Sequence, residues 1–250
     1  MLVVGGTRGT GRLAVGLLRR HGYGVRALAR DPGRAREVLG PDVEIREGDL
    51  TRRETLPGAM RNVDHVLFTA GVTGRPAGED LIIATVYEGM RSTLAAAADV
   101  GFRGRFVYMT SIGVNRRSIA GSLLNLVKRN TLHWRRRAEE EIRASGLAYT
   151  VVRAGMLTNG PGGRRALLLG QEDYPLAAQY RIARADVAET LVQALEHPAT
   201  SRTTFDVVQG RGGRREDWQA LFGRLRPDAC DRAADRDRRD AGPDPQMPAC

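Results

Sequence analysis

Short apolar runs alternate along most of the chain with longer segments whose apolar residues recur at helical spacing. The runs predict strands at residues 2–4, 23–29, 43–46, 65–70, 105–110 and 148–153. Between them the spacing predicts helices that begin after Gly11 and after Asp31, and helices over 54–61, 80–100 and 124–144. Strands that alternate with helices in this way predict an α/β fold whose doubly wound parallel sheet is covered on both faces.

The pattern becomes looser after Arg153. A turn or loop is expected at 159–163, a short strand at 166–169, an amphipathic helix at 185–195, a strand at 203–208 and a last helix at 215–225. From residue 227 onward Asp, Arg, Ala and Pro dominate, and there is too little apolar surface to offset the entropy of ordering. We therefore expect one domain over 1–226 and a disordered tail over 227–250.

The first strand leads into a glycine-rich turn, Gly5-Gly-Thr-Arg-Gly-Thr-Gly11, and the turn opens a helix. Strand, turn and helix together predict a phosphate cradle, because free N–H groups at the helix start face a negative charge. Gly5 permits the tight turn, Gly9 lets the backbone approach a pyrophosphate, and Gly11 lets the helix pack close to the strand. An ordinary glycine turn is the alternative, and the flanking elements favour the cradle. Met1 lies so close to Gly5 that we expect the first strand to lack a few residues.

Charge and composition narrow the class of protein. The net charge is +10, and Lys128 is the only lysine among the 39 basic residues. The densest basic cluster, 135–137, is followed directly by three glutamates at 139–141, which predicts a self-compensating helix face and no nucleic-acid binding.

No apolar run approaches the roughly 18 residues of a membrane span, and no signal-peptide pattern precedes the first strand. We expect a cytoplasmic protein. Cys230 and Cys250 have neither metal-ligand nor redox spacing, and no metal site is predicted.

Six segments, taken in order, identify a resemblance. They are Val4–Gly11, Val25–Pro32, Gly48–Leu50, Phe106–Gly113, Arg143–Arg153 and Ala183–Ala188. With them the chain resembles the atypical short-chain dehydrogenase/reductases, in particular the NAD(P)H-binding, NmrA-like branch, from residue 1 to about 225. The resemblance implies a Rossmann-type doubly wound parallel sheet with a small C-terminal substrate-side subregion at about 154–226.

The resemblance also implies a nicotinamide dinucleotide at the carboxyl ends of the strands. Asp49 and Leu50 would flank the adenine, and Ala70 and Gly71 would line the route to the nicotinamide. A simple turn role for Asp49 is the alternative. The expected cofactor-binding residues are Gly5, Thr7, Arg8, Gly9, Thr10, Gly11, Arg30, Asp49, Leu50, Ala70, Gly71, Thr110 and Arg153.

The end of the second strand indicates which dinucleotide binds. An NAD site has a carboxylate there for the ribose 2′-hydroxyl, whereas an NADP site has an arginine. Here the strand ends in Arg30, and Arg8 within the glycine turn can reach the same phosphate. Asp31 stands near the position expected of the acidic residue, but its neighbour Pro32 favours a helix-capping role. The predicted cofactor is NADP(H).

The expected catalytic residues are Ser111, after the fifth strand, and Arg135. In the main short-chain family a Ser orients the carbonyl, a Tyr donates a proton and a Lys four residues later lowers the pKa of that Tyr. When the predicted helix is aligned with the corresponding helix of the main family, Thr131 stands at the Tyr position and Arg135 at the Lys position. Threonine is too weak an acid for this role, and arginine cannot give up its proton. The usual proton relay is therefore absent.

Three aromatic or imidazole side chains near this site have alternative roles. Trp134 could cover the pocket, although core packing is the favoured interpretation. His133 could donate a proton, but beside three arginines a surface position is favoured. Tyr108 alternates with buried neighbours and is expected in the core.

Three functions fit these observations. The first is an NADPH-dependent oxidoreductase that passes hydride to a small apolar or aromatic acceptor (quinone, flavin, or activated carbonyl or alkene) without the Tyr-Lys pair. The second is a non-catalytic NADP(H)-binding redox sensor that acts through a protein partner, and the third is an isomerase or assembly factor. The loop from Asn159 to Tyr180 is expected to form much of the acceptor pocket, where Leu167–Leu169, Tyr174 and Tyr180 indicate an apolar ligand. The oligomeric state is open.

Overall fold

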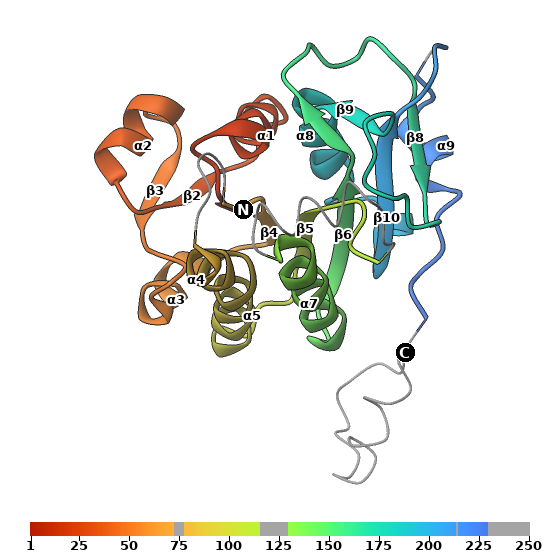
Figure 1. Ribbon diagram of the computed structural model, residues 1–250. Helices are drawn as coiled ribbons and strands as arrows, with labels where there is room; N and C mark the ends of the chain where they lie inside the picture. The colour runs from red at the N-terminus through yellow and green to blue at the C-terminus, as the bar shows by residue number, and fades with distance from the viewer. Residues whose placement is uncertain (73–77, 116–129, 214, 230–250) are drawn as a thin grey trace, which may run out of the picture.

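The computed structural model describes residues 1–72, 78–115, 130–213 and 215–229. These form an eight-stranded sheet in the order β3-β2-β1-β4-β5-β6-β10-β8 (Figure 1). Its strands are β1 Leu2–Val4, β2 Arg26–Ala29, β3 Glu44–Glu47, β4 His65–Phe68, β5 Arg105–Ser111, β6 Ala148–Ala154, β8 Leu167–Gly170 and β10 Thr203–Gln209. Neighbouring strands pair in parallel except β8, which runs antiparallel to β10. The doubly wound, Rossmann-type fold predicted from the sequence is confirmed.

Helices cover both faces of the sheet (Figure 1). One face carries α1 Gly9–Arg20, α2 Pro32–Leu39 and α8 Arg184–Gln193, and the other carries α3 Pro57–Met60, α4 Glu79–Ile82, α5 Gly89–Asp99 and α7 Thr131–Ala144. A short helix, α9 Trp218–Phe222, packs near β8.

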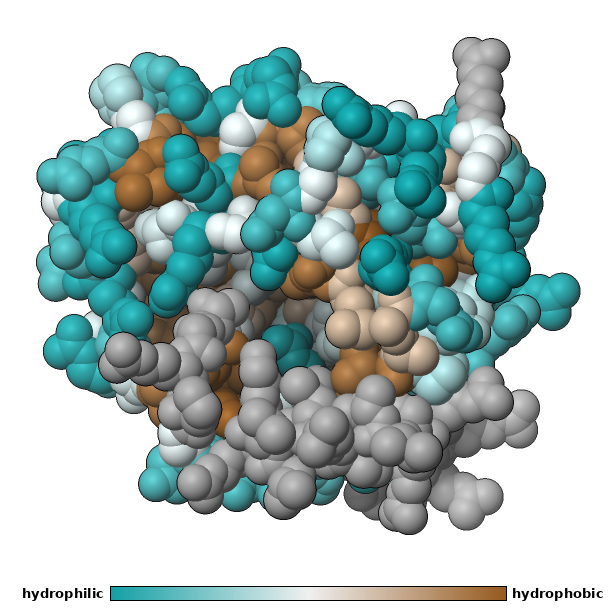
Figure 2. Space-filling view, turned by 45° about the horizontal axis from the view of Figure 1, so that its top comes forward, coloured by the Kyte–Doolittle hydropathy of each residue, from teal (hydrophilic) through white to brown (hydrophobic). Residues whose placement is uncertain are grey.

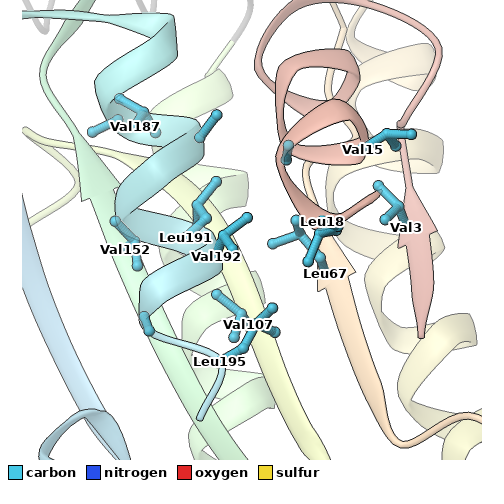
Figure 3. Packing of buried hydrophobic residues seen from close by; sticks show 14 of the residues in the cluster. Val3, Val15, Leu18, Leu67, Val107, Val152, Val187, Leu191, Val192 and Leu195 are labelled. Carbon is cyan, nitrogen blue, oxygen red and sulfur yellow. The ribbon is translucent and has the colours of Figure 1, made fainter. Parts of the chain in front are cut away.

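Alternation along the strands assigns their side chains to these two layers. Val3, Leu67, Val107 and Val152 point toward α1 and α8, which lie side by side in Figure 3. The intervening residues, among them Phe68, join the cluster under α3, α5 and α7. Both clusters are almost fully buried, and each fully buried Leu or Val side chain contributes about 1.5–3 kcal/mol. The packed layers fix the strand ends, where functional side chains gather in such folds.

Several elements differ from the prediction in their bounds. The helix expected at 80–100 is divided by a π-helical segment, η2 Ile83–Glu88, and the one expected at 54–61 consists of η1 Arg53–Thr55 followed by α3. The last helix is confined to α9. Of the helix expected at 124–144, the described part is α7, and 124–129 lies outside the described residues. Local spacing detects a helix, but tertiary packing and caps set its ends.

The C-terminal part contains a second small sheet that the sequence pattern missed. It pairs β7 Met156–Thr158 with β9 Arg181–Ala183 in parallel. These two three-residue segments show too little alternation to detect, whereas the equally short β1 is marked by the glycine turn that follows it. A 3₁₀ turn, η3 Pro198–Thr200, precedes β10.

Ordered contacts reach slightly beyond residue 226, where the domain was expected to end. The carboxylate of Asp228 accepts hydrogen bonds from the backbone N–H and hydroxyl of Thr204, at 2.9 and 2.6 Å, and from the Tyr149 hydroxyl, at 2.8 Å. Residue 228 is therefore attached to β10. The rest of the predicted tail, 230–250, lies outside the described residues. Within the part of the chain that the structure describes, no helix is both long and apolar enough to cross a membrane.

Candidate functional site

The glycine turn connects the end of β1 to α1. Gly5 has φ +87°, and a Cβ there would lie 2.7 Å from the backbone nitrogen of Ala70, just beyond β4. A Cβ on Gly11 would lie 2.2 Å from the Gly5 carbonyl oxygen. Real side chains never come so close, so both positions require glycine. The turn is thereby packed against the end of β4, with Thr69 bonded back to Val4.

Gly9 differs from Gly5 and Gly11 because there is open space around the position that a Cβ would take. It has φ +55°, and among the described residues outside its own helix and its chain neighbours only Arg184 comes within 4 Å of its Cβ position, with Nε at 3.7 Å. The N-terminus of α1 has no acidic residue in its first turn, and its N-cap residue, Arg8, makes no side-chain cap. The buried Thr10 hydroxyl in the same turn has no hydrogen-bond partner within the described residues. Open space beside uncapped N–H groups fits a dinucleotide pyrophosphate.

The basic residues predicted at the ribose end lie at the surface. Arg30 directly follows β2, and it and Arg8 are both exposed. The Asp31 carboxylate accepts a 3.0 Å hydrogen bond from the backbone N–H of Arg34, so its capping role is confirmed. Asp31 is therefore engaged with α2, and the nearest strand-end side chain is a guanidinium, which suits a 2′-phosphate.

Asp49 and Leu50 form the turn after β3. The Asp49 carboxylate accepts bonds from the backbone N–H and hydroxyl of Thr51, both at 2.9 Å. Burial would raise the Asp49 pKa, but these two bonds, with Arg30 nearby, lower it overall. Leu50 packs against Gly89 at the start of α5, where a Cβ would lie 2.9 Å from the Leu50 Cβ. Both side chains therefore stabilise the turn, which is the alternative role of Asp49. Their contact with an adenine stays a prediction.

Arg135 of α7 reaches the end of β4. Its Nη2 atom lies 3.1 Å from the Cβ position of Gly71. Among the described residues it forms no ion pair, unlike the adjacent Arg136, whose Nε lies 3.6 Å from the Glu140 carboxylate. The structure thus brings together Arg135 and Gly71, two residues assigned from sequence to the nicotinamide side.

Two buried hydroxyls of β5 face the same region. Neither the Tyr108 nor the Thr110 hydroxyl makes a well-formed hydrogen bond within the described residues, and the Tyr108 hydroxyl lies beside Thr110 and Arg135. Burial raises the pKa of Tyr108 to about 12, and the charge of Arg135 opposes this rise. Tyr108 belongs to the core, as predicted, and its hydroxyl end lies near Arg135.

Ser111 ends β5, next to Ala154 of β6. Its hydroxyl is half-buried and donates a 3.1 Å hydrogen bond to the carbonyl of Ile112. Thr131 is the first residue of α7, and Asn130 before it adopts a left-handed conformation. Thr131, which the sequence register assigns to the position of the usual phenol, is half-buried.

Two further side chains of α7 were considered for the site, His133 as a proton donor and Trp134 as a cover of the pocket. His133 is exposed, as predicted. Trp134 packs against Tyr87, with ring centroids 5.4 Å apart, and its Nε1 donates to Glu79 at 3.1 Å. Its packing role is thus favoured over a pocket-covering role.

Arg153 differs from its predicted role. Its guanidinium is almost fully buried and donates to Glu139 of α7, at 2.7 Å from Nη2, and to Asp173. Nε donates to Glu139 as well, at 3.1 Å. All three guanidinium nitrogens therefore face carboxylates, and the side chain links β6 to α7, while its contact with a cofactor stays a prediction. This pairing joins segments far apart in sequence, which local patterns cannot detect.

Asp206 of β10 completes this buried cluster. It is 1% exposed and accepts a 2.6 Å bond from the backbone N–H of Tyr174, and the Arg153 guanidinium lies 4.0 Å away. Burial raises the pKa of Asp206 to about 6, although Tyr174 and Arg153 oppose the rise. The cluster attaches the segment at 173–174 to the sheet.

Only part of the loop that the sequence predicts as the acceptor pocket lies near the end of β5. Leu167–Gly170 is the edge strand β8, and Leu167 lies in the main core, so Leu167 is not a pocket residue. Tyr174 and Tyr180 stack at 4.8 Å and pack on Ile112, directly after Ser111. The two tyrosines are thus brought beside the end of β5. Figure 2 shows apolar surface toward the middle of one face, between hydrophilic side chains.

A separate hollow of about 550 Å³ lies at the amino ends of the strands. It is lined by residues such as Met1, Arg26 and His65. Since ligands of open α/β sheets bind at the carboxyl ends, this hollow is not the candidate site. No cluster of metal-ligating side chains occurs among the described residues.

Sequence reasoning missed Arg184 at the start of α8. Its Nη1 donates a 2.8 Å hydrogen bond to the Asn159 side chain, and its Nε lies beside Gly9. The signal was present, because Arg184 stands in one of the six family segments, but only the fold brings α8 beside α1 (Figure 3).

Comparison with known proteins agrees with this geometry. Residues 5–198 match a protein-family model described as NAD(P)H-binding. Sanguinarine reductase from Eschscholzia californica is 30% identical over 261 residues, which cover 90% of this chain and 95% of that protein. An NAD(P)H azoreductase from Xenophilus azovorans is 28% identical over a region that covers 83% of this chain and 67% of the azoreductase.

Solved structures show the same fold. An NAD-dependent epimerase/dehydratase from Bacillus halodurans superposes with a TM-score of 0.72 at 25% identity, over 84% of this chain and 94% of that chain. A short-chain dehydrogenase/reductase from Veillonella parvula in complex with NADP superposes with a TM-score of 0.67 at 18% identity, over 85% and 94% of the two chains. The protein belongs to the NAD(P)H-binding family of the atypical short-chain dehydrogenase/reductases.

Proposed function

We propose that the protein is an NADPH-dependent reductase that passes hydride to a small apolar or aromatic acceptor, such as a quinone, a flavin or an activated carbonyl or alkene, without a Tyr-Lys pair. The observation that carries this proposal is the position of Arg135 against Gly71, with Thr131 one helical turn earlier. A permanent cation stands on the nicotinamide side, and α7 supplies no phenol there.

The side chains at the strand ends would divide the work. NADPH, when bound, supplies the hydride. The Arg135 guanidinium stabilises negative charge that develops on an acceptor oxygen or nitrogen, since it forms no ion pair within the described residues that would neutralise it. The Ser111 hydroxyl orients the acceptor, and because arginine keeps its proton, the proton comes from water. Quinones and flavins suit this arrangement because their reduced anions are stable without a strong acid.

An aromatic acceptor has independent support. The stacked rings of Tyr174 and Tyr180 are half-buried and pack beside Ile112, next to Ser111. Flat aromatic surfaces favour flat ligands by offset stacking. Relatives named as a sanguinarine reductase and an azoreductase favour the reductase class.

Mixing the protein with NADPH and a panel of quinones, flavins and enones tests the proposal, with loss of the reduced-nicotinamide absorbance as the readout. Turnover of at least one quinone or flavin is expected. NADPH binding without turnover of any acceptor would favour the alternative, a non-catalytic redox sensor that acts through a protein partner. The cytoplasmic location, the absence of nucleic-acid and membrane partners and the NmrA-like branch stay predictions.

A further inference from the structure

The N-terminus of α8 lies beside the glycine turn. α1 and α8 pack side by side on one face of the sheet, and both begin at the carboxyl ends of its strands (Figure 3). The Arg184 Nε lies 3.7 Å from the Cβ position of Gly9, where the backbone is open for a phosphate. A guanidinium from the C-terminal part of the chain therefore covers the turn contributed by the N-terminal part.

The charge of Arg184 is available to an anion. The neighbouring carboxylates of Asp186 and Glu189 both accept from Arg215. The partner of Arg184 is the neutral amide of Asn159, at 2.8 Å, and it forms no ion pair within the described residues. A guanidinium held by a neutral acceptor is oriented without being neutralised.

Asn159 also connects Arg184 to the segment after β7. Further along that segment the Gly163 N–H donates to Asp186 at 2.7 Å. The start of α8 thus contacts residues 159–163, where the sequence predicts the acceptor side of the proposed reductase, and also reaches the glycine turn.

We infer that Arg184 is a ligand of the cofactor pyrophosphate, supplied by the substrate-side subregion and oriented by Asn159. The pyrophosphate is common to NADPH and NADH, whereas Arg8 and Arg30 are positioned for the 2′-phosphate of NADPH alone. Arg184 therefore contributes equally to the binding of both dinucleotides. The acceptor-side label of 159–163 rests on the proposed function, but the binding of Arg184 does not.

Titration of the protein with NADPH and with NADH, followed by nicotinamide fluorescence, tests the inference. Arg184→Ala should weaken both cofactors by about the same factor, roughly tenfold to a hundredfold, as expected for one charge-assisted hydrogen bond. Arg181→Ala is the matched control, because Arg181 is exposed nearby and donates to the Ala178 carbonyl. Its affinities should match the unmodified protein.

Asn159→Asp, which changes the charge but hardly the size of the side chain, provides a second test. The new carboxylate would pair with Arg184 and weaken both cofactors, and this effect should disappear in the Arg184→Ala background. Unchanged affinities in Arg184→Ala, or a loss for NADPH alone, would overturn the inference. If Arg184→Ala weakens NADPH and NADH binding equally but the unmodified protein reduces no acceptor, the role of Arg184 is supported and the proposed reductase function is refuted.

Discussion

The guanidinium of Arg135 lies against Gly71, with Nη2 3.1 Å from the position that a Cβ of residue 71 would take. This contact joins the first turns of α7 to the segment after β4. It puts a permanent positive charge beside Gly71, and the sequence register assigns Arg135 to the lysine position of the main short-chain family and Thr131, four positions earlier, to its tyrosine position. Arg135 should therefore act electrostatically, without proton transfer.

Replacing Arg135 by Ala should lower kcat with a quinone by about 10²–10³-fold, the loss typical of removing one donor that stabilises a developing anion. Arg136→Ala is the control, since Arg136 is exposed and pairs with Glu140. Steady-state kinetics under saturating NADPH measure both. Equal kcat values in the two variants would remove Arg135 from the chemistry.

Cofactor preference should depend on the arginines at the ribose end. Arg30→Ala should weaken NADPH binding by about tenfold to a hundredfold and leave NADH binding nearly unchanged, because a charge-assisted hydrogen bond to the 2′-phosphate contributes roughly 1.5–3 kcal/mol. Titration of the variant with each dinucleotide measures the ratio. Equal affinity of the unmodified protein for NADPH and NADH would contradict this account.

Gly11 should tolerate no side chain. In Gly11→Ala the Cβ would meet the Gly5 carbonyl at 2.2 Å, so α1 must shift from the turn and cofactor binding should be lost with several degrees of Tm. Gly16→Ala on the same helix is the control. Its nearest contact is the flexible Arg20 side chain at 3.5 Å, and alanine favours a helix by about 0.5–1 kcal/mol. Thermal unfolding with and without NADPH compares them.

Local features of this kind were predictable from sequence. The roles of Gly5 and Gly11 in packing and of Asp31 in capping follow from neighbours within a few positions. The ion pairs of Arg153 were not predictable from local sequence, because its partners, Glu139 and Asp173, come from α7 and a loop.

Arg184 was missed for a related reason. Its proximity to Gly9 exists only after α8 packs beside α1. Side chains whose partners are distant in sequence cannot be assigned from spacing, even where the motif that contains them is recognised.

The buried carboxyl of Asp206 should make stability depend on pH. Burial raises its pKa to about 6 in the folded state, against about 3.9 in an unfolded chain. The stability that it contributes is therefore complete below about pH 4 and is lost as the pH rises through about 6. Asparagine at this position does not ionise.

The free energy of unfolding of the unmodified protein, relative to Asp206→Asn, should thus fall between about pH 4 and pH 6.5, by up to about 2–3 kcal/mol, and level off at higher pH. Loss of the Arg153 contact adds only a constant offset, so the slope carries the prediction. Urea unfolding at several pH values measures it. Exposed Asp99, changed to Asn, is the control, and a flat difference for Asp206→Asn would refute the raised pKa.

The central claim, reduction without a phenol, is tested most directly by comparing a quinone with a ketone of matched shape under saturating NADPH. The account predicts a higher kcat/KM for the quinone. It also predicts that Ser111→Ala slows quinone turnover by no more than about 10²-fold, the low end of a positioned proton donor's contribution. Faster reduction of the ketone, together with collapse of activity in Ser111→Ala, would contradict it. That result would mean that a tyrosine from elsewhere in the chain, Tyr174 or Tyr180 first, donates the proton.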